Sequence, residues 1–482
     1  MLTRRIALGA VGCVVADALL GGCGGSSDGA ASNAAPAPNP QPTPSGPQTV
    51  AAVSVATTEV GSIGSGFAGL SYEKNSMALP RFESGNNALI GLFRLLGPSL
   101  LRIGGNSVDT TQWAASGAGR TSGQVAPSDI DALSGFLQAT GWTVLYGVNL
   151  ATSTPAAAAE EVAYAVESLG SSLYAIEIGN EPDLYGGKYF TSWSVTDFEQ
   201  RWGLFRAAIL QAVPGVKLTG PAAAGNISTW TVPFGEHVTS REIVLLTQHY
   251  YRGNGQSAAS TVTELVSPDP HLIADLVTLK SGAAAIGVPF RIAETNSFYN
   301  GGANGVSDSY ASSLWVIDDL FNVAQGGGVG VNMHGGGDGD GYTPIADSDG
   351  AVVEARPEYY GLLLFTLARQ GTLLTTSVTA GALDVSAYTV RTLSGGLNIV
   401  VVNKDSTQNL QLSVDTGISV NTATLLVMTG PALDATSGVA IQGAAVAPDG
   451  SFAPAAAYTA DIAGSVVSCY VPALSAVLIQ LS

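Results

Sequence analysis

Two glutamates stand at the ends of short apolar runs, where chemical groups are often placed. Glu181 follows the run 174–180, YAIEIGN, and Glu294 closes the run 289–295, PFRIAET. A pair of carboxyl groups at the mouth of one cavity suits acid/base and nucleophilic work on a glycosidic bond. We therefore predict that Glu181 is a general acid/base and Glu294 a nucleophile.

The neighbours of these glutamates suggest separate tasks. A nucleophile must stay ionised, and we expect Arg102 and Tyr250 to hold Glu294 in that form. Asn180 is predicted to bind a sugar 2-hydroxyl, an interaction that strengthens in an oxocarbenium-like transition state. Because strict strand alternation places Asn180 and Glu181 on opposite faces, we expect a bend or bulge between them.

The elements that must position these residues alternate in type. Short, nearly continuous apolar runs are each followed by a helical pattern, which is typical of parallel strands buried on both faces. A (β/α)8 barrel is the natural interpretation, with chemistry at the carboxyl ends of the strands. An open doubly wound sheet is the alternative, but no GxGxxG follows the first run. The expected strands are 66–73, 99–105, 143–150, 174–180, 217–224, 243–251, 289–295 and 328–335, and clear helical patterns cover 127–141, 197–213, 312–325 and 357–370.

The spacing of apolar residues changes after residue 371. Short alternating runs separated by Gly, Asp, Asn and Ser predict a β-sandwich over 372–482. Residues 49–62 also have a strand pattern and are predicted to complete it, which leaves 63–371 for the barrel.

The amino-terminus has the pattern of an export signal. A pair of Arg precedes an apolar run, and small residues precede Cys23, as in a lipoprotein-type signal peptide over residues 1–22. We predict lipidation of Cys23, a Pro- and Ala-rich tether over 23–48, and export to the cell envelope. An ordinary secretory signal is the alternative. Removal of Cys13 and lipidation of Cys23 would leave only Cys469, which excludes an intramolecular disulfide.

The charge and composition of the chain argue against several classes of binding partner. The 482-residue chain carries a formal net charge of −18, which argues against nucleic acid and densely sulfated polymers. The Gly- and Asp-rich run 335–350 lacks the closing Glu of an EF-hand loop, so we expect neither a metal site nor a cofactor. Glu177 is expected to pair structurally inside the barrel, and Lys74 and Lys188 to lie at the surface.

Several motifs together resemble a known family. IGNEPD and RIAETNSFYNGG resemble the retaining glycoside hydrolases of the large (β/α)8 clan, in which Asn-Glu on strand four carries the acid/base and Glu on strand seven is the nucleophile. LRIGGNS, QHYY and MHGGGDGDGY narrow the resemblance to glycoside hydrolase family 79, over residues 50–482. That family contains exo-β-glucuronidases and endo-acting heparanases.

The resemblance implies roles for particular positions. Glu181 matches the acid/base, Glu294 the nucleophile, and Tyr250 a tyrosine beside the nucleophile. In bacterial β-glucuronidases of this family, a loop after the nucleophile holds the uronate carboxylate through neutral donors. The remaining substrate-binding positions implied in this way are Tyr299, Asn300, Gly301 and Gly302 in that loop, His334 and Tyr342 from strand eight, and Glu73 from strand one, beside Arg102 and Asn180.

The expected function is therefore a retaining exo-β-glucuronidase acting on a glucuronide-containing glycan, with or without a 4-O-methyl group. A neutral-sugar glycosidase of the same clan, of the xylosidase or arabinofuranosidase type, is the first alternative. A heparanase-like endo-enzyme is disfavoured by the acidic balance of the chain. A surface lipoprotein that binds glycans without cleaving them is the non-enzymatic alternative. Contact with a membrane is expected only through the lipid at Cys23.

Overall fold

The computed structural model describes residues 39–337, 339 and 341–482. The predicted signal peptide, Cys23 and the first part of the tether lie outside the described residues. Within this part of the chain, no helix has the length and apolarity needed to span a bilayer.

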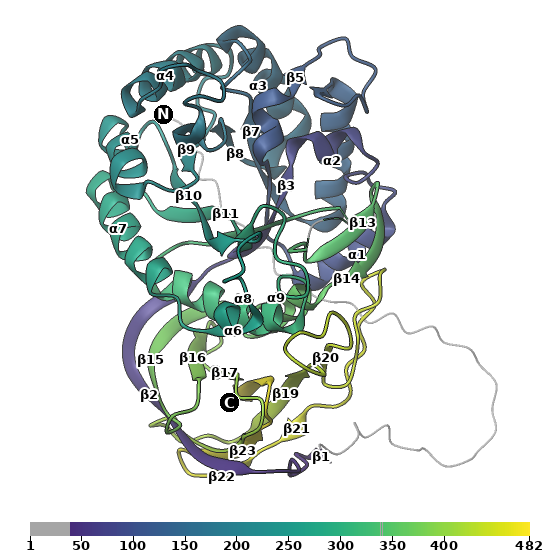
Figure 1. Ribbon diagram of the computed structural model, residues 1–482, viewed down its shortest axis with the longest axis vertical. Helices are drawn as coiled ribbons and strands as arrows, with labels where there is room; N and C mark the ends of the chain where they lie inside the picture. The colour runs from purple at the N-terminus through teal and green to yellow at the C-terminus, as the bar shows by residue number, and fades with distance from the viewer. Residues whose placement is uncertain (1–38, 338, 340) are drawn as a thin grey trace, which may run out of the picture. The chain divides into compact units, whose positions relative to one another are not determined.

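The first part of the fold is a closed barrel of parallel strands, as the alternating pattern predicted. The strands neighbour one another in chain order, and the last closes against the first. Their apolar residues are buried because helices cover the outside of the barrel (Figure 1). The strands are β3 (Ala68–Glu73), β4 (Leu100–Gly104), β7 (Thr143–Val148), β8 (Leu173–Ile178), β9 (Leu218–Ala223), β10 (Leu245–Asn254), β11 (Phe290–Tyr299) and β12 (Val331–Gly335).

The helices between these strands begin at recognisable signals. Ser194 caps the first turn of its helix by accepting from the backbone N–H of Asp197, and Pro stands in the first turn of several others. The helices are α1 (Asn87–Leu96), α2 (Pro127–Thr140), α3 (Pro155–Leu169), α4 (Val195–Ala212), α5 (Val232–His237), α6 (Val262–Val266), α7 (Pro270–Ile286), α8 (Tyr310–Gln325) and α9 (Pro357–Leu367).

The second half of the fold is a 12-stranded mixed sheet. The strand predicted from residues 49–62 is β2 (Gln48–Ile63), which lies beside β15 (Gly371–Thr379) in Figure 1. It pairs on its other side with β18 (Asn409–Asp415). The sheet is one hydrogen-bonded path rather than two separate sheets, and it encloses a core to which its distant strands contribute, such as Leu410 and Ile479. Its other strands are β1 (Asn39–Pro40), β15 (Gly371–Thr379), β16 (Val385–Thr392), β17 (Leu397–Asn403), β18 (Asn409–Asp415), β19 (Ala423–Thr429), β20 (Ala440–Ile441), β21 (Tyr458–Thr459), β22 (Asp461–Ala463), β23 (Val466–Val471) and β24 (Ser475–Leu481).

The end of the predicted tether belongs to this sheet. Strand β1 pairs with β21, and the side-chain amide of Gln41 donates to the Tyr470 carbonyl at 2.7 Å. The side-chain amide of Asn409 donates to the Ser45 carbonyl at 2.9 Å. The end of the segment predicted as a tether is therefore attached to the sheet at several points rather than being free along its whole length.

The barrel and the sheet are joined through helix α8. Asp318 accepts from Lys404 at 2.8 Å, Tyr388 at 2.9 Å and Ser386 at 2.5 Å, all from the sheet. The rings of Phe321 and Tyr388 stack at 4.4 Å beside this cluster. Most of these groups are buried, so this polar cluster fixes the contact between the two halves.

Candidate active site

The two candidate glutamates lie at the carboxyl-terminal mouth of the barrel. Glu294 belongs to β11, and Glu181 follows the end of β8. The backbone of Gly179 and of Glu181 is left-handed, with φ of 88° and 50°. This is the bend predicted between Asn180 and Glu181. The strained turn is held by a 2.8 Å hydrogen bond from the Glu181 N–H to the Ala222 carbonyl.

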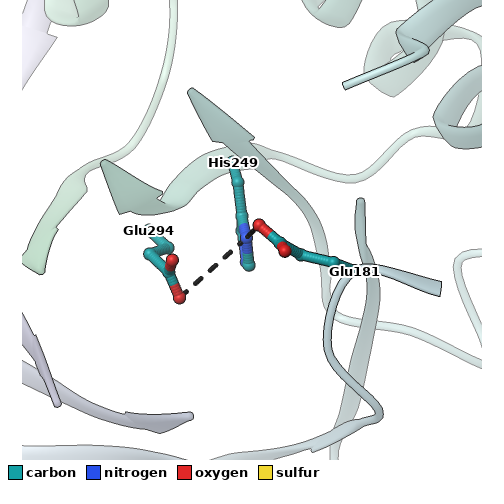
Figure 2. A group of neighbouring side chains, drawn as sticks. All are labelled: Glu181, His249 and Glu294. Atoms are coloured by element: carbon teal, nitrogen blue, oxygen red, sulfur yellow. Dashed lines mark hydrogen bonds and ion pairs between the residues drawn. The ribbon is translucent and has the colours of Figure 1, made fainter. Parts of the chain in front are cut away.

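His249 lies between the two glutamates. Its Nδ1 is 3.1 Å from Glu181 Oε1 and 4.0 Å from Glu294 Oε2. Figure 2 shows the two carboxyl groups on either side of its ring. One oxygen of each glutamate and a ring nitrogen of His249 all lie within 4.8 Å of one another. Carboxyl groups about 5–5.5 Å apart suit a double displacement, whereas a water-mediated single displacement needs about 6.5–9.5 Å.

Glu294 is held as a carboxylate. Arg102 Nη1 donates to its Oε2 at 2.7 Å, and the Tyr251 hydroxyl donates to its Oε1 at 2.9 Å. Burial raises the pKa of Glu294, but His334, His249 and Arg102, with the hydrogen bond from Tyr251, outweigh it and hold the pKa far below its usual range. Such a group is ionised at neutral and mildly acidic pH, as a nucleophile requires.

Glu181 has a different environment. Its side chain is 13% exposed against 6% for Glu294, and its Oε1 lies 3.1 Å from His249 Nδ1. The guanidinium that neutralises Glu294 does not bond to Glu181. Two carboxyl groups with such unequal surroundings are suited to unequal roles.

Arg102 organises the floor of the site. It donates from Nε to Glu177 at 2.6 Å, from Nη1 to Glu294, and from Nη2 to Asn180 Oδ1 at 2.9 Å. The predicted structural pairing of Glu177 is confirmed. The expected pairing of Arg102 with Glu294 is also confirmed. The Arg102 side chain is fully buried beneath these acceptors, so its contact with a substrate stays a prediction. Its bond to the Asn180 carbonyl oxygen leaves the amide N–H groups of that residue as the end available to a hydroxyl.

The tyrosine beside the nucleophile is Tyr251, not Tyr250 as predicted. The Tyr250 hydroxyl donates to Asp269 at 2.5 Å, on the helix side of β10. The register of β10 against β11 shifts between Gln248 and His249. Beyond that irregularity, His249 and Tyr251 point into the barrel, so the adjacent Tyr250 points outward.

Residues of the first and eighth strands approach Glu294 from the other side. His334 Nδ1 lies 3.0 Å from Ser71 Oγ and 3.7 Å from Glu294, and its Nε2 lies 3.7 Å from Glu73. Glu73 also accepts from the backbone N–H of Ser107 at 2.7 Å. Burial lowers the pKa of His334, but Glu294 and Glu73 outweigh it and raise the pKa above its usual value. Tyr342 lies with its ring 6.0 Å from that of His334.

The loop after β11 has an unusual backbone. Asn300, Gly301 and Gly302 have φ of 64°, 80° and 81° in succession. The Asn300 side chain donates to Asn254 at 3.0 Å, and Tyr299 is 45% exposed with its ring 6.4 Å from that of Tyr251. The loop therefore brings an exposed aromatic ring and backbone N–H groups to the rim of the site.

One basic residue near the site was placed wrongly by sequence. Lys74, expected at the surface, is buried; it donates to the Gly147 carbonyl at 2.6 Å and pairs with Glu161. Glu161 lies far away in the sequence, on α3, so no local pattern signalled this pair. Lys188 is exposed, as expected.

The geometry of the site argues against a bound metal ion. Glu181, His249 and Glu294 are close enough to share a cation. However, Arg102 lies 2.7 Å from Glu294 and already neutralises that carboxylate, which disfavours a second positive charge.

The comparisons with known proteins agree with this architecture. No protein-family model matches the chain. Two curated relatives are similar to part of it: a β-glucuronidase of Aspergillus niger, 26% identical over 42% of this chain, and a β-glucuronidase of Neurospora crassa, 27% identical over 40%. The matched regions span only 42% and 39% of the relatives' own lengths.

Solved structures match over far more of the chain. A 4-O-α-L-rhamnosyl-β-D-glucuronidase from Fusarium oxysporum has a TM-score of 0.76 at 19% identity, and the match covers 89% of this chain and 100% of that one. A family 51 arabinofuranosidase from Xanthomonas axonopodis has a TM-score of 0.67 at 15% identity, with 90% and 100% covered. The chain thus has the fold of these barrel glycosidases with an attached β-domain.

Proposed function

We propose that the protein is a retaining exo-β-glucuronidase of the glycoside hydrolase family 79 type. The observation that carries this proposal is the pair Glu181 and Glu294, with oxygens within 4.8 Å at the mouth of a (β/α)8 barrel and with unequal surroundings. The names of both curated relatives and of the Fusarium oxysporum structure favour glucuronic acid as the sugar.

The reaction proceeds in two displacements. Glu181 donates its proton to the glycosidic oxygen while a Glu294 oxygen attacks C1, so the bond to the leaving alcohol breaks and a glycosyl ester forms with inversion. Glu181, now a carboxylate, takes a proton from water as that water attacks C1. The ester bond breaks, Glu294 is released as a carboxylate, and the second inversion restores the β configuration.

The surroundings of Glu294 suit this sequence. Arg102 and Tyr251 stabilise the carboxylate before attack and again when it leaves. The Asn180 carbonyl is held by Arg102, so its amide N–H groups are oriented toward a sugar 2-hydroxyl. His334 and Glu73 are placed to bind other hydroxyls from the opposite side.

In this proposal, the loop after β11 binds the carboxylate of the glucuronic acid. The run Tyr299–Gly302 contributes a phenol, an amide and the backbone N–H groups of three successive residues with positive φ. A single carboxylate is well served by neutral donors of this kind. Tyr342 lies beside the same pocket, with its ring 6.2 Å from that of Tyr251.

A neutral-sugar glycosidase is the second candidate, because the run Tyr299–Gly302 contains no Lys or Arg. Export as a lipoprotein through Cys23 also remains a proposal, and it rests on the sequence of the signal.

Hydrolysis of p-nitrophenyl β-glucuronide, compared with the β-xyloside, β-glucoside and α-arabinofuranoside, tests the proposal. Glu294→Gln serves as the blank. We expect activity on the glucuronide that is lost in the variant. Activity on a neutral sugar instead would overturn the choice of glucuronic acid while keeping the mechanism.

A further inference from the structure

The amino-terminal end of the barrel, opposite the catalytic mouth, holds a cavity of about 240 Å³. Its wall is formed by the first residues of several barrel strands and the loops that precede them. The cavity shares Gly66, Pro98 and Ser99 with a neighbouring cavity of about 480 Å³, so the two adjoin. The polar or charged side chains in the wall of the smaller cavity are Ser65, Ser99, Thr143, Tyr174 and Arg291, and none of the lining residues is acidic.

Arg291 is the unusual member of this wall. Only 3% of its surface is exposed. Its Nε donates to Asn332 Oδ1 at 2.6 Å, and its Nη2 donates to the carbonyls of Val331 at 2.9 Å and Phe67 at 3.2 Å. Every one of these acceptors is neutral. Across residues 39–337, 339 and 341–482, no carboxylate forms an ion pair with Arg291 and no side chain or carbonyl accepts from its Nη1.

The other deeply buried guanidinium groups of the barrel are compensated differently. Arg102 pairs with Glu177 and Glu294, and Arg81 pairs with Asp347 at 2.6 Å. A buried charge without a counterion is costly, since neutral dipoles replace only part of the lost hydration. Burial lowers the pKa of Arg291 to about 9, with only Tyr174 acting in the opposite direction. The cavity beside Arg291 is therefore a place where a negative charge would be stabilised.

We infer that this cavity is a binding site for a small oxyanion, such as inorganic phosphate or a short carboxylate, held by Arg291. Nη1 of the planar guanidinium, which no described residue engages, is available for a charge-assisted hydrogen bond. Ser65, Thr143 and Tyr174, which carry hydroxyl groups, line the same cavity as Arg291. The chain as a whole is acidic, so the attraction is local to this wall. This site is separate from the proposed catalytic site, so oxyanion binding can be tested independently of glycosidase activity.

An oxyanion that binds the folded state but not the unfolded state raises the melting temperature of the protein. We would record thermal unfolding of the full chain in increasing sodium phosphate, and separately sodium acetate, with sodium chloride keeping the ionic strength constant. The expected result is a saturable rise of about 2 °C or more with at least one oxyanion. A rise with phosphate only, acetate only or both identifies the kind of oxyanion that the site takes.

Two variants make the result specific. Arg291→Gln should lose the rise, whereas Arg94→Gln, which removes an exposed guanidinium on α1, should keep it. No rise in the wild type, or an equal rise in Arg291→Gln, would overturn the inference. Should Arg291→Gln fail to fold, wild-type crystals soaked in selenate decide: an anomalous peak within hydrogen-bonding distance of Arg291 supports the site, and an empty cavity contradicts it.

Discussion

Replacing Tyr251 by Phe removes one hydrogen bond from the proposed nucleophile and little else. The Tyr251 hydroxyl donates to Glu294 Oε1 at 2.9 Å. Burial, followed by the charge of Glu294, raises the pKa of Tyr251 well above its usual value, so this hydroxyl stays a donor throughout the working pH range. The variant keeps the ring and its packing against Tyr342 and Tyr299.

The size of the effect follows from the charge on the acceptor. A hydrogen bond to a charged group contributes about 1.5–3 kcal/mol, and each 1.4 kcal/mol is about tenfold in rate. Water entering the partly exposed site recovers some of this, so we expect kcat/KM to fall about tenfold. The loss of the donor also raises the pKa of Glu294, which moves the acidic limb of the pH profile to higher pH.

The adjacent Tyr250 provides a matched control. Tyr250→Phe removes the same hydroxyl from the next residue, but that hydroxyl donates to Asp269 outside the barrel. We expect kcat/KM to stay near the wild-type value in this variant, with a lower melting temperature. The assay is the pH dependence of kcat/KM on p-nitrophenyl β-glucuronide. A large loss in Tyr250→Phe with none in Tyr251→Phe would refute the assignment of the two faces of β10.

Three further predictions concern the acid/base, a charged pocket residue and the contact between the two halves. Glu181→Gln should slow the cleavage of substrates with poor leaving groups by about 10²–10⁴, with a much smaller loss on activated aryl glycosides; equal losses on both would contradict its role as the acid. His334 has a raised pKa, so its contribution to the free energy of unfolding is fully present below about pH 6.5, the value in the unfolded chain, and is lost as the pH rises through the higher folded-state pKa. Denaturant titrations across this pH range should show that slope in the wild type and not in His334→Gln, and an unchanged slope in the variant would count against the pairing with Glu294 and Glu73. Asp318→Asn weakens the ion pair with Lys404 and should lower the free energy of unfolding by about 2 kcal/mol with kcat/KM retained, whereas a loss of activity at full stability would show that α8 acts on the site.

Much of the site was predictable because a (β/α)8 barrel places the ends of its strands together. The alternation of apolar runs with helical patterns located all eight barrel strands. Because chemistry in such a barrel lies at the carboxyl ends of the strands, Glu181 and Glu294 were expected to lie close together, and the structure shows that they do. The bend after β8 was predictable for a similar reason. Adjacent Asn180 and Glu181 could serve one pocket only if the strand alternation broke between them.

What the sequence left open depended on local irregularity and on distant partners. The register shift in β10 determines whether Tyr250 or Tyr251 faces the inside of the barrel. In the sequence, the only signal for Tyr251 was that it lies two residues after His249 and so shares a strand face with it. The burial of Lys74 depends on Glu161 across the barrel wall. Residues 39–48 have a tether-like composition, yet Asn39 and Pro40 pair with a strand more than 350 residues later, and the Asn409 side chain donates to the Ser45 carbonyl.

The proposed mechanism requires Glu294 to form a covalent bond with the sugar. The most direct measurement is mass spectrometry of the protein after incubation with an activated 2-deoxy-2-fluoro-β-glucuronide, which slows release of the glycosyl-enzyme. We expect a mass increase of one fluoroglucuronyl group, located on the peptide that contains Glu294 and absent from Glu294→Gln. An adduct on another residue, or turnover of glucuronides with inverted configuration and no adduct, would contradict it.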